Sequence, residues 1–162
     1  MPDNGKGERM RLDYLFLADR VEPEAMGGAF INAFGIGMND FLFSAFPSAI
    51  PSTWLVAGFM LEPGEFDTDH AVEIEFWNPD GILLSRTNVG VMRSPQHNLD
   101  PDARVRFHNC TNIAGLPFPK AGPYEIRVFV NDEQYGALTI NARHDLTLTV
   151  DTPGAVRVPP VV

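Results

Sequence analysis

The fold of this chain is decided by residues 115–140, which read GLPFPKAGPYEIRVFVNDEQYGALTI. Within this stretch Tyr124, Ile126, Val128 and Val130 alternate with Glu125, Arg127, Phe129 and Asn131. Successive side chains of a β-strand point to opposite faces, so the alternation predicts a strand with one buried face and with Phe129 on the other. Residues 131–134 are polar and turn-prone, and residues 135–140 resume an extended pattern. The stretch therefore predicts a β-hairpin whose apolar face the rest of the chain covers.

Further strands are predicted on both sides of this hairpin, because apolar residues there alternate with polar ones or form short continuous runs. They are expected at residues 10–17, 29–37, 53–61, 70–77, 82–89, 104–110 and 146–150. In the first of these strands Met10, Leu12, Tyr14 and Phe16 are expected on one face, with Leu15 and Leu17 on the other. The tetrapeptide Asn78-Pro79-Asp80-Gly81 predicts a tight turn, since proline presets φ and glycine accepts a left-handed conformation.

Eight or nine strands without crossover helices predict an all-β protein, an antiparallel β-sandwich with Greek-key connections, immunoglobulin-like or jelly-roll-like. A closed barrel is the alternative. The 14 glycines and 14 prolines suit the many turns of such a fold. A length of 162 residues suits one domain, which we expect at residues 10–150. Residues 1–9 are expected to form a flexible arm, and the Pro-rich residues 151–162 an extended or disordered tail.

The segment at residues 39–52, NDFLFSAFPSAIPS, is rich in phenylalanine but interrupted by two prolines, which exclude a long regular element. One interpretation is a connection that folds its aromatic side chains over an open end of the core. The other is a partner-binding loop built on Phe41, Phe43 and Phe46, because exposed contiguous apolar surface marks interfaces. The sequence leaves both open.

Charge and cysteine content narrow the partners and the compartment. The formal net charge is −9, which disfavours nucleic acid as a partner because an acidic surface repels phosphate. Cys110 is the only cysteine, so the chain has no internal disulfide, as is usual in a reducing cytoplasm. The polar N-terminal residues are unlike a signal peptide, and the apolar run at residues 54–61 is too short to span a bilayer. We expect a cytoplasmic protein without a membrane segment.

Candidate metal ligands are present but poorly spaced. Asp67, Asp69 and His70 are close in sequence, and His97, His108 and Cys110 are further candidates. The acidic segment lacks the glycine and the spacing of a calcium-binding loop, and no two ligands have zinc-site spacing. We expect no metal and no cofactor.

Candidate catalytic residues are equally sparse. Cys110 and His108 lie two residues apart on one predicted strand, so they share a face and could form a thiolate pair. No glycine-rich turn lies nearby to stabilise an oxyanion, and a lone cysteine usually fills apolar space. We expect no catalytic residue, and therefore a protein that is not an enzyme.

The chain resembles a bacterial family of β-sandwich domains of unknown function. The resemblance rests on Leu12 with Asp19 close behind, on Pro79-Asp80-Gly81, and on Leu116-Pro117-Phe118-Pro119 leading into Gly122-Pro123-Tyr124. It covers residues 12–142 and implies a compact β-sandwich with no assigned activity and no catalytic residue to carry over.

Two outward aromatic residues point to a binding role. Trp77 and Phe129 are expected on the outer faces of their strands, among charged neighbours, where they could anchor a protein partner or stack on a sugar. The sequence thus predicts a non-enzymatic interaction or structural module that contacts another protein, within a larger assembly. The alternative is a domain that binds a small ligand or a carbohydrate through these aromatics. The identity of the partner and the oligomeric state are left open.

Overall fold

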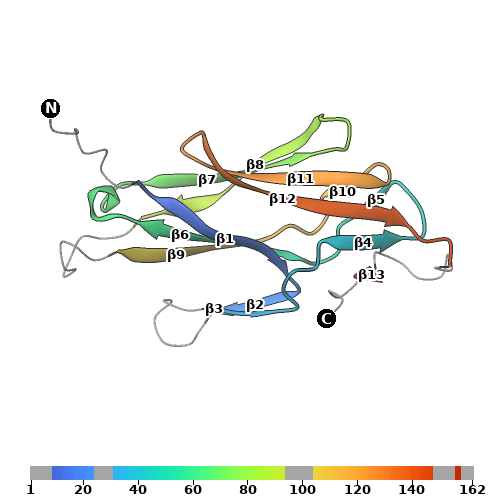
Figure 1. The fold of residues 1–162 in the computed structure, drawn as a ribbon, viewed down its shortest axis with the longest axis horizontal. Coiled ribbons are helices and arrows are strands. Elements are labelled where there is room, and N and C mark those ends of the chain that lie inside the picture. The colour runs from blue at the N-terminus through green and yellow to red at the C-terminus, as the bar shows by residue number, and fades with distance from the viewer. Residues whose placement is uncertain (1–8, 24–30, 94–103, 148–155, 158–162) are drawn as a thin grey trace, which may run out of the picture.

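The computed structural model describes residues 9–23, 31–93, 104–147 and 156–157, and its strands form two main sheets (Figure 1). The three-stranded sheet has the order β1 (Arg11–Ala18), β6 (Trp54–Leu61), β9 (Val105–Asn112), with both pairings antiparallel. The six-stranded sheet has the order β13 (Val156–Arg157), β4 (Asp40–Phe43), β12 (Glu133–His144), β11 (Gly122–Val130), β7 (His70–Trp77), β8 (Leu83–Met92). Its pairings are antiparallel except that of β4 with β12, which is parallel.

Short elements complete the fold. The strands β2 (Arg20–Pro23) and β3 (Ile31–Phe34) form a two-stranded ribbon, and β5 (Ser48–Ala49) pairs with β10 (Pro117–Phe118). A single 3-10 turn, η1 (Pro63–Glu65), follows β6, and the part of the chain that is described contains no α-helix. The prediction of an all-β, antiparallel β-sandwich is confirmed. Because of these short strands, the structure has more strands than the eight or nine expected.

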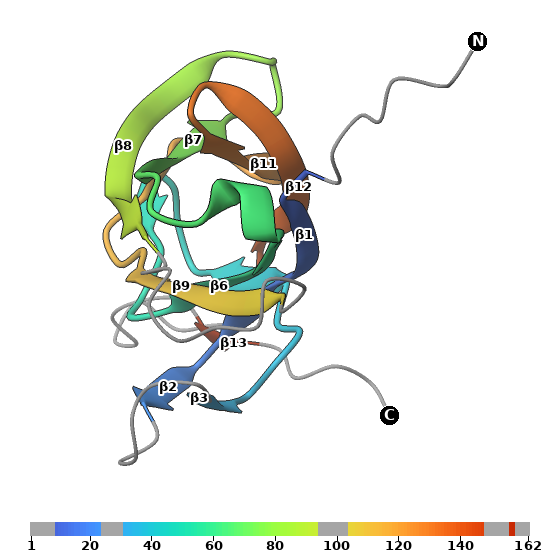
Figure 2. The ribbon, with the colours of Figure 1, turned by 90° about the vertical axis from the view of Figure 1, so that its left-hand side faces the viewer.

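The two sheets face each other across one apolar core, and side chains rather than backbone hydrogen bonds close the edges between them. Figure 2 looks nearly along the strands and shows both sheets around the interior. β1 lies beside β12, and β8 beside β9, but among the described residues no ladder joins the sheets. Leu12 lies so close to Gly136 of β12 that a Cβ there would sit 2.4 Å from Leu12 Cδ2. The fold is therefore a sandwich and not the alternative closed barrel.

The β11–β12 hairpin forms the centre of the six-stranded sheet, as predicted. Ile126 pairs with Leu138 of β12 on one side and with Phe76 of β7 on the other. The four alternating apolar side chains of β11 are at most 2% exposed: Tyr124, Ile126, Val128 and Val130. Burial of such side chains stabilises the fold by about 1.5–3 kcal/mol each. Their inward orientation is confirmed.

The turn of this hairpin is tighter than the polar stretch at residues 131–134 indicated. Asn131 and Asp132 alone form it, with φ angles of 48° and 67°, while Glu133 already belongs to β12. Two consecutive positive φ angles define the turn whose twist matches the flanking strands, and asparagine and aspartate tolerate them. Asn131 also ties the turn to β7, because its Oδ1 accepts a hydrogen bond from the Ala71 amide at 2.9 Å.

The segment at residues 39–52 enters the core. Phe41 and Phe43 lie on β4 and are 0% and 1% exposed, and Phe46 packs on Phe43 with ring centroids 5.4 Å apart. Phe43 also contacts Phe118, at 5.2 Å between centroids. The phenylalanines of this segment therefore pack in or against the core.

β1 differs from its prediction in one respect that shapes the rest of the molecule. Its pairing with β6 shifts register between Leu12 and Tyr14, which is a β-bulge. Leu12 packs on the core, but after the bulge Leu15 and Leu17 do so instead of Tyr14 and Phe16. The expectation that Leu12, Tyr14 and Phe16 share one face was wrong, because one extra residue reverses the alternation.

The chain ends are described only in part. The expected arm lies outside the described residues except for Arg9. Of the expected tail, Val156–Arg157 forms β13 and pairs with β4, and the other residues of the tail lie outside the described ranges. The predicted strand at residues 146–150 begins in a turn at Leu146 and Thr147, with the rest outside. No helix in the described ranges is long and apolar enough to cross a bilayer.

Candidate functional site

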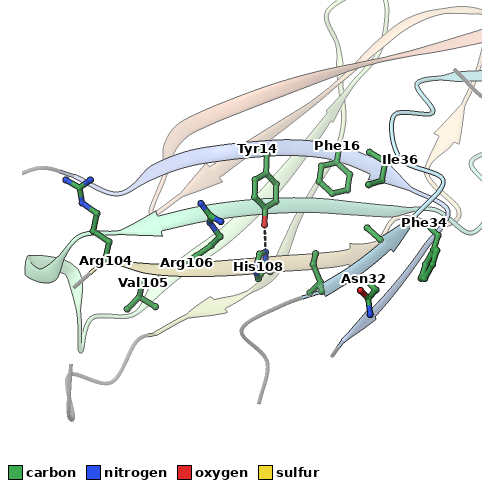
Figure 3. A pocket seen from close by; sticks show the side chains of 11 residues that line it. Tyr14, Phe16, Asn32, Phe34, Ile36, Arg104, Val105, Arg106 and His108 are labelled. Atoms are coloured by element: carbon green, nitrogen blue, oxygen red, sulfur yellow. Dashed lines mark hydrogen bonds between the residues drawn. The ribbon is translucent and has the colours of Figure 1, made fainter. Parts of the chain in front are cut away.

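A cleft of about 770 Å³ opens between the β2–β3 ribbon and the outer face of the three-stranded sheet (Figure 3). We call it the ribbon cleft. One wall comes from β1, from β9 and from Arg104, which precedes β9. The other wall comes from β3 and the turn that follows β3. The lining residues are Tyr14, Phe16, Ile31, Asn32, Ala33, Phe34, Ile36, Arg104, Val105, Arg106 and His108. Most of these side chains are apolar or aromatic, and the charged ones are arginines.

The bulge in β1 supplies the aromatic wall of the ribbon cleft, because it turns Tyr14 and Phe16 to the outer face. The Tyr14 ring lies over Gly58, its partner on β6, where an added Cβ would sit 2.2 Å from a ring atom. Only glycine leaves room for this arrangement, in which an aromatic ring covers a glycine across the strands. Tyr14 and Phe16 then stack with centroids 5.7 Å apart.

A tyrosine–histidine pair lies in the middle of the cleft. The Tyr14 hydroxyl is hydrogen-bonded to His108 Nδ1, and the two rings stack with centroids 5.9 Å apart. Burial raises the pKa of Tyr14, although the charge of Arg106 acts in the opposite direction. The phenol therefore keeps its proton at neutral pH and is able to donate it to His108.

Guanidinium groups lie at one end of the cleft. Arg106 Nη2 contacts Asp13 Oδ2 at 3.1 Å, and Arg11 Nε contacts the other oxygen of Asp13 at 2.9 Å. Both contacts lower the pKa of Asp13, and the contact with Arg11 has the larger effect. Asp13 therefore stays ionised at neutral pH. One carboxylate thus serves two guanidinium groups, which leaves a net positive charge. Arg104, the neighbouring cleft residue, contacts Glu62 at 3.0 Å.

The opposite end is apolar and partly open to solvent. Phe34 is 43% exposed and Ile36 is 49% exposed, and the Arg20 guanidinium lies over the Phe34 ring at 4.5 Å from its centroid. Backbone hydrogen bonds hold this end on β1: Asp19 donates to the Phe34 carbonyl at 2.8 Å, and Gly37 donates to the Leu17 carbonyl at 3.0 Å. The ribbon is therefore anchored where it leaves the sheet.

Trp77 and Phe129 lie on the outer face of the six-stranded sheet, far from the ribbon cleft, and both are partly exposed. The register separates them, since Trp77 pairs with Glu125 and Phe129 pairs with Glu73, four residues along β7. That spacing is about 13 Å along a strand. An arginine guanidinium also lies over each ring: Arg127 is 4.4 Å from the Trp77 centroid, and Arg86 is 5.7 Å from the Phe129 centroid. The two aromatics therefore do not form one platform.

The remaining candidates from the sequence are dispersed. Cys110 and His108 share the outer face of β9, but burial raises the pKa of the Cys110 thiol, and the His108 ring is bonded to Tyr14. His70 Nε2 lies 3.0 Å from the Glu65 carbonyl, and Asp69 pairs with Arg93 at 3.1 Å. In the described ranges no three side chains of histidine, cysteine, aspartate or glutamate form a metal-binding group. His97 lies outside these ranges, and the three phenylalanines of residues 39–52 pack in or against the core.

Sequence reasoning missed the residues that build the ribbon cleft. Two signals pointed to them. Residues 14–17 are apolar without interruption, which fits a strand with both faces covered. Gly58 interrupts an otherwise apolar strand, which is typical of close approach by another group. Neither signal says that a ribbon 20 residues away forms the opposite wall.

The fold and the cleft define a β-sandwich with an open, cation-bearing apolar cleft on its smaller sheet. Residues 13–143 match a family of unknown function, DUF6941, and the chain belongs to that family. No curated protein matches the sequence.

Several solved structures are similar to this chain, among them two at low identity. One is an immunoglobulin-like protein from Pseudomonas aeruginosa, at 14% identity and a TM-score of 0.41 over 86% of this chain and 100% of that one. The other is the alkylpurine DNA glycosylase AlkC of Pseudomonas fluorescens bound to DNA containing an abasic site analogue. It is similar at 12% identity and a TM-score of 0.38 over 85% of this chain and 31% of that one. TM-scores this low carry nothing about ligand or activity to this chain.

Proposed function

We propose that this protein is a non-enzymatic binding module that holds a segment of a protein partner in the ribbon cleft. The observation that carries the proposal is the apolar end of the cleft, where Phe34 and Ile36 remain 43% and 49% exposed beside the aromatic wall of Tyr14 and Phe16. Apolar side chains gathered in this way mark contact sites, because covering them removes their surface from water.

The shape of the cleft favours a protein segment over a small molecule. Small-molecule sites enclose most of the ligand surface. The half-exposed rim at Phe34 and Ile36 would leave a small ligand in contact with water. A protein segment continues beyond the rim and covers both side chains.

One chemical feature supports binding rather than catalysis. The raised pKa of Cys110 leaves little thiolate at neutral pH, so the only thiol of the chain is a poor nucleophile there. As part of the same proposal we place the protein in the cytoplasm, where a lone half-buried cysteine is stable as a thiol.

Carbohydrate binding at Trp77 is the weaker candidate. A sugar ring stacks on the face of an indole, but Arg127 lies over the Trp77 ring at 4.4 Å from its centroid. Stacking there would require the guanidinium to leave and its cation–π contact to be lost.

The proposal is tested with peptides from a phage-displayed library of random 12-residue sequences, selected on the full chain. The affinity of a recovered peptide is then measured for the wild-type protein and for Ile36→Ser and Val91→Ser. Val91 is the matched control, because it is 59% exposed but lies on β8 of the other sheet. We expect Ile36→Ser to weaken binding about tenfold, the equivalent of about 1.4 kcal/mol, and Val91→Ser to leave it unchanged. Equal effects of the two substitutions, or no recovered peptide, would overturn the proposal.

A further inference from the structure

We infer that the segment held in the ribbon cleft is extended and carries a carboxylate side chain four residues away from an apolar side chain. The carboxylate pairs with Arg106, and the apolar side chain packs between Phe16 and Ile36. The inference rests on the proposed function and specifies the chemistry of the partner.

The charge at the arginine end of the cleft is opposite to that of the molecule. The chain has 21 acidic and 12 basic residues, but among the described residues that line the cleft the charged side chains are Arg104 and Arg106. Glu62 neutralises Arg104, whereas Arg106 and Arg11 share the one carboxylate of Asp13, so an excess positive charge lies at Arg106. A local positive potential on a negative protein favours an acidic segment and disfavours a basic one.

Arg106 is the cation best placed for a partner carboxylate. Its side chain is 50% exposed, and it shares the one carboxylate of Asp13 with Arg11, whose side chain is 58% exposed. A guanidinium has five N–H donors, whereas an ionised carboxylate has about four acceptor positions for both partners together. A second carboxylate therefore finds donors here and forms charge-assisted hydrogen bonds.

The distance between the two ends of the cleft follows from the strand register. Arg106 pairs with Met60, whereas Phe16 pairs with Val56, which in turn pairs with Cys110. Arg106 is thus four strand positions from the level of Phe16, about 13 Å. Figure 3 shows the same order along the cleft, with the arginines at one end, Tyr14 and His108 in the middle, and Phe16 and Ile36 at the other.

A separation of four residues in the partner fits this geometry. In an extended segment four residues span about 13 Å, and an even spacing places both side chains on the same face. A helical segment covers only about 6 Å in four residues, so it would not reach both ends. The cleft therefore selects extended segments by spacing as well as by charge.

The same library provides the test. We expect recovered peptides to share aspartate or glutamate four positions from a large apolar residue. A peptide with glutamate at that position is compared with its glutamine counterpart, on the wild-type protein, on Arg106→Gln and on Arg143→Gln. Arg143 is the matched control, because it is 64% exposed and pairs with a single aspartate, Asp40 at 2.9 Å, on the other sheet.

Glutamine in the peptide should weaken binding about five- to tenfold on the wild type and on Arg143→Gln, but less than twofold on Arg106→Gln, where the partner charge is already lost. The wild-type preference for glutamate should also decline with added salt. Thermal melts establish that each variant is folded, and Arg106→Lys is a second variant that keeps the charge and should retain a preference for glutamate.

The outcomes separate the two proposals. Peptides that depend on Ile36 but share no acidic residue would overturn the inference and leave the protein-binding function in place. The same holds if the glutamine peptide loses as much affinity on Arg106→Gln as on Arg143→Gln. Displacement of the peptide by an equal concentration of a single-stranded oligothymidine would assign the arginines to nucleic acid and would also overturn the inference. Peptides indifferent to Ile36→Ser would overturn the proposed function itself.

Discussion

Tyr14 is the residue on which the ribbon cleft depends. Its ring covers Gly58, stacks on Phe16 and His108, and bonds His108 through the hydroxyl. The raised pKa of the phenol keeps the O–H in place through the neutral range, so Tyr14 itself carries no charge there. An aromatic side chain held on several sides loses little conformational entropy on binding, which suits a contact surface.

At the same scale, Cys110 should react slowly with iodoacetamide at neutral pH. Burial raises the pKa of the thiol above its usual value, so the reactive thiolate is scarce at neutral pH and increases as the pH is raised through the alkaline range. The labelling rate, followed by mass spectrometry, should therefore continue to rise beyond the pH at which the same thiol levels off in guanidinium chloride. Fast labelling of the folded protein at pH 7, equal to that of the unfolded chain, would contradict this and would reopen a nucleophilic role.

At the scale of elements, the hairpin of β11 and β12 stabilises the six-stranded sheet through one face only. Ile126→Ala should lower the free energy of unfolding by about 2–4 kcal/mol, because it removes buried surface and leaves a cavity at a position that is 0% exposed. Val128→Ala should act in the same direction. Denaturant unfolding monitored by circular dichroism measures these changes.

Phe129→Ala is the comparison on the opposite face of β11. Phe129 is partly exposed and its ring contacts Arg86, so its removal should be distinctly less destabilising than Ile126→Ala. Similar large losses at both positions would mean that both faces of the hairpin are covered.

The pairing of β1 with β6 depends on the glycine beneath Tyr14. Gly58→Ala places a methyl group 2.2 Å from a Tyr14 ring atom, so the ring must move, with a loss of about 1–3 kcal/mol. In a Tyr14→Ala background the same substitution should be nearly neutral, because the space is then free. A double-mutant cycle on the free energy of unfolding measures this coupling. Additive effects would show that the ring and the glycine do not interact.

At the scale of the whole molecule, stability should be independent of divalent metal ions. The residues that first suggest a metal have other partners, since Asp69 pairs with Arg93 and His70 Nε2 lies against the Glu65 carbonyl. Thermal melts in EDTA and in added Ca²⁺ should coincide, because only a ligand that binds the native state raises its apparent stability. A shift of several degrees on chelation would contradict this, and Asp67→Asn with Asp69→Asn would then identify the ligands.

The outer faces of the two sheets differ in how far their aromatic side chains are covered. The six-stranded sheet covers its outer aromatics with its own arginines, so its outer face is largely self-contained. On the three-stranded sheet the ribbon folds over β1 and β9, and although Arg20 lies over the Phe34 ring, Phe34 and Ile36 remain partly exposed. The open surface therefore lies on the smaller sheet.

What the sequence alone determined is local. Alternation at residues 124–130 and the turn at Asn78-Pro79-Asp80-Gly81 correctly predicted the central hairpin, the β7–β8 turn and the all-β class, because side-chain period and turn geometry depend on neighbouring residues. The outward orientation of Trp77 and Phe129 followed from the same period.

Only the tertiary structure decided where the cleft lies. The bulge between Leu12 and Tyr14 has no local signature in the sequence, since it arises from how β1 pairs with β6, yet it reverses the faces of four side chains. The ribbon of β2 and β3 lies over β9, a strand much later in the chain, and brings Phe34 and Ile36 opposite Phe16 and His108. Such contacts between distant segments depend on the packing of the whole sandwich, which no periodicity along the chain encodes.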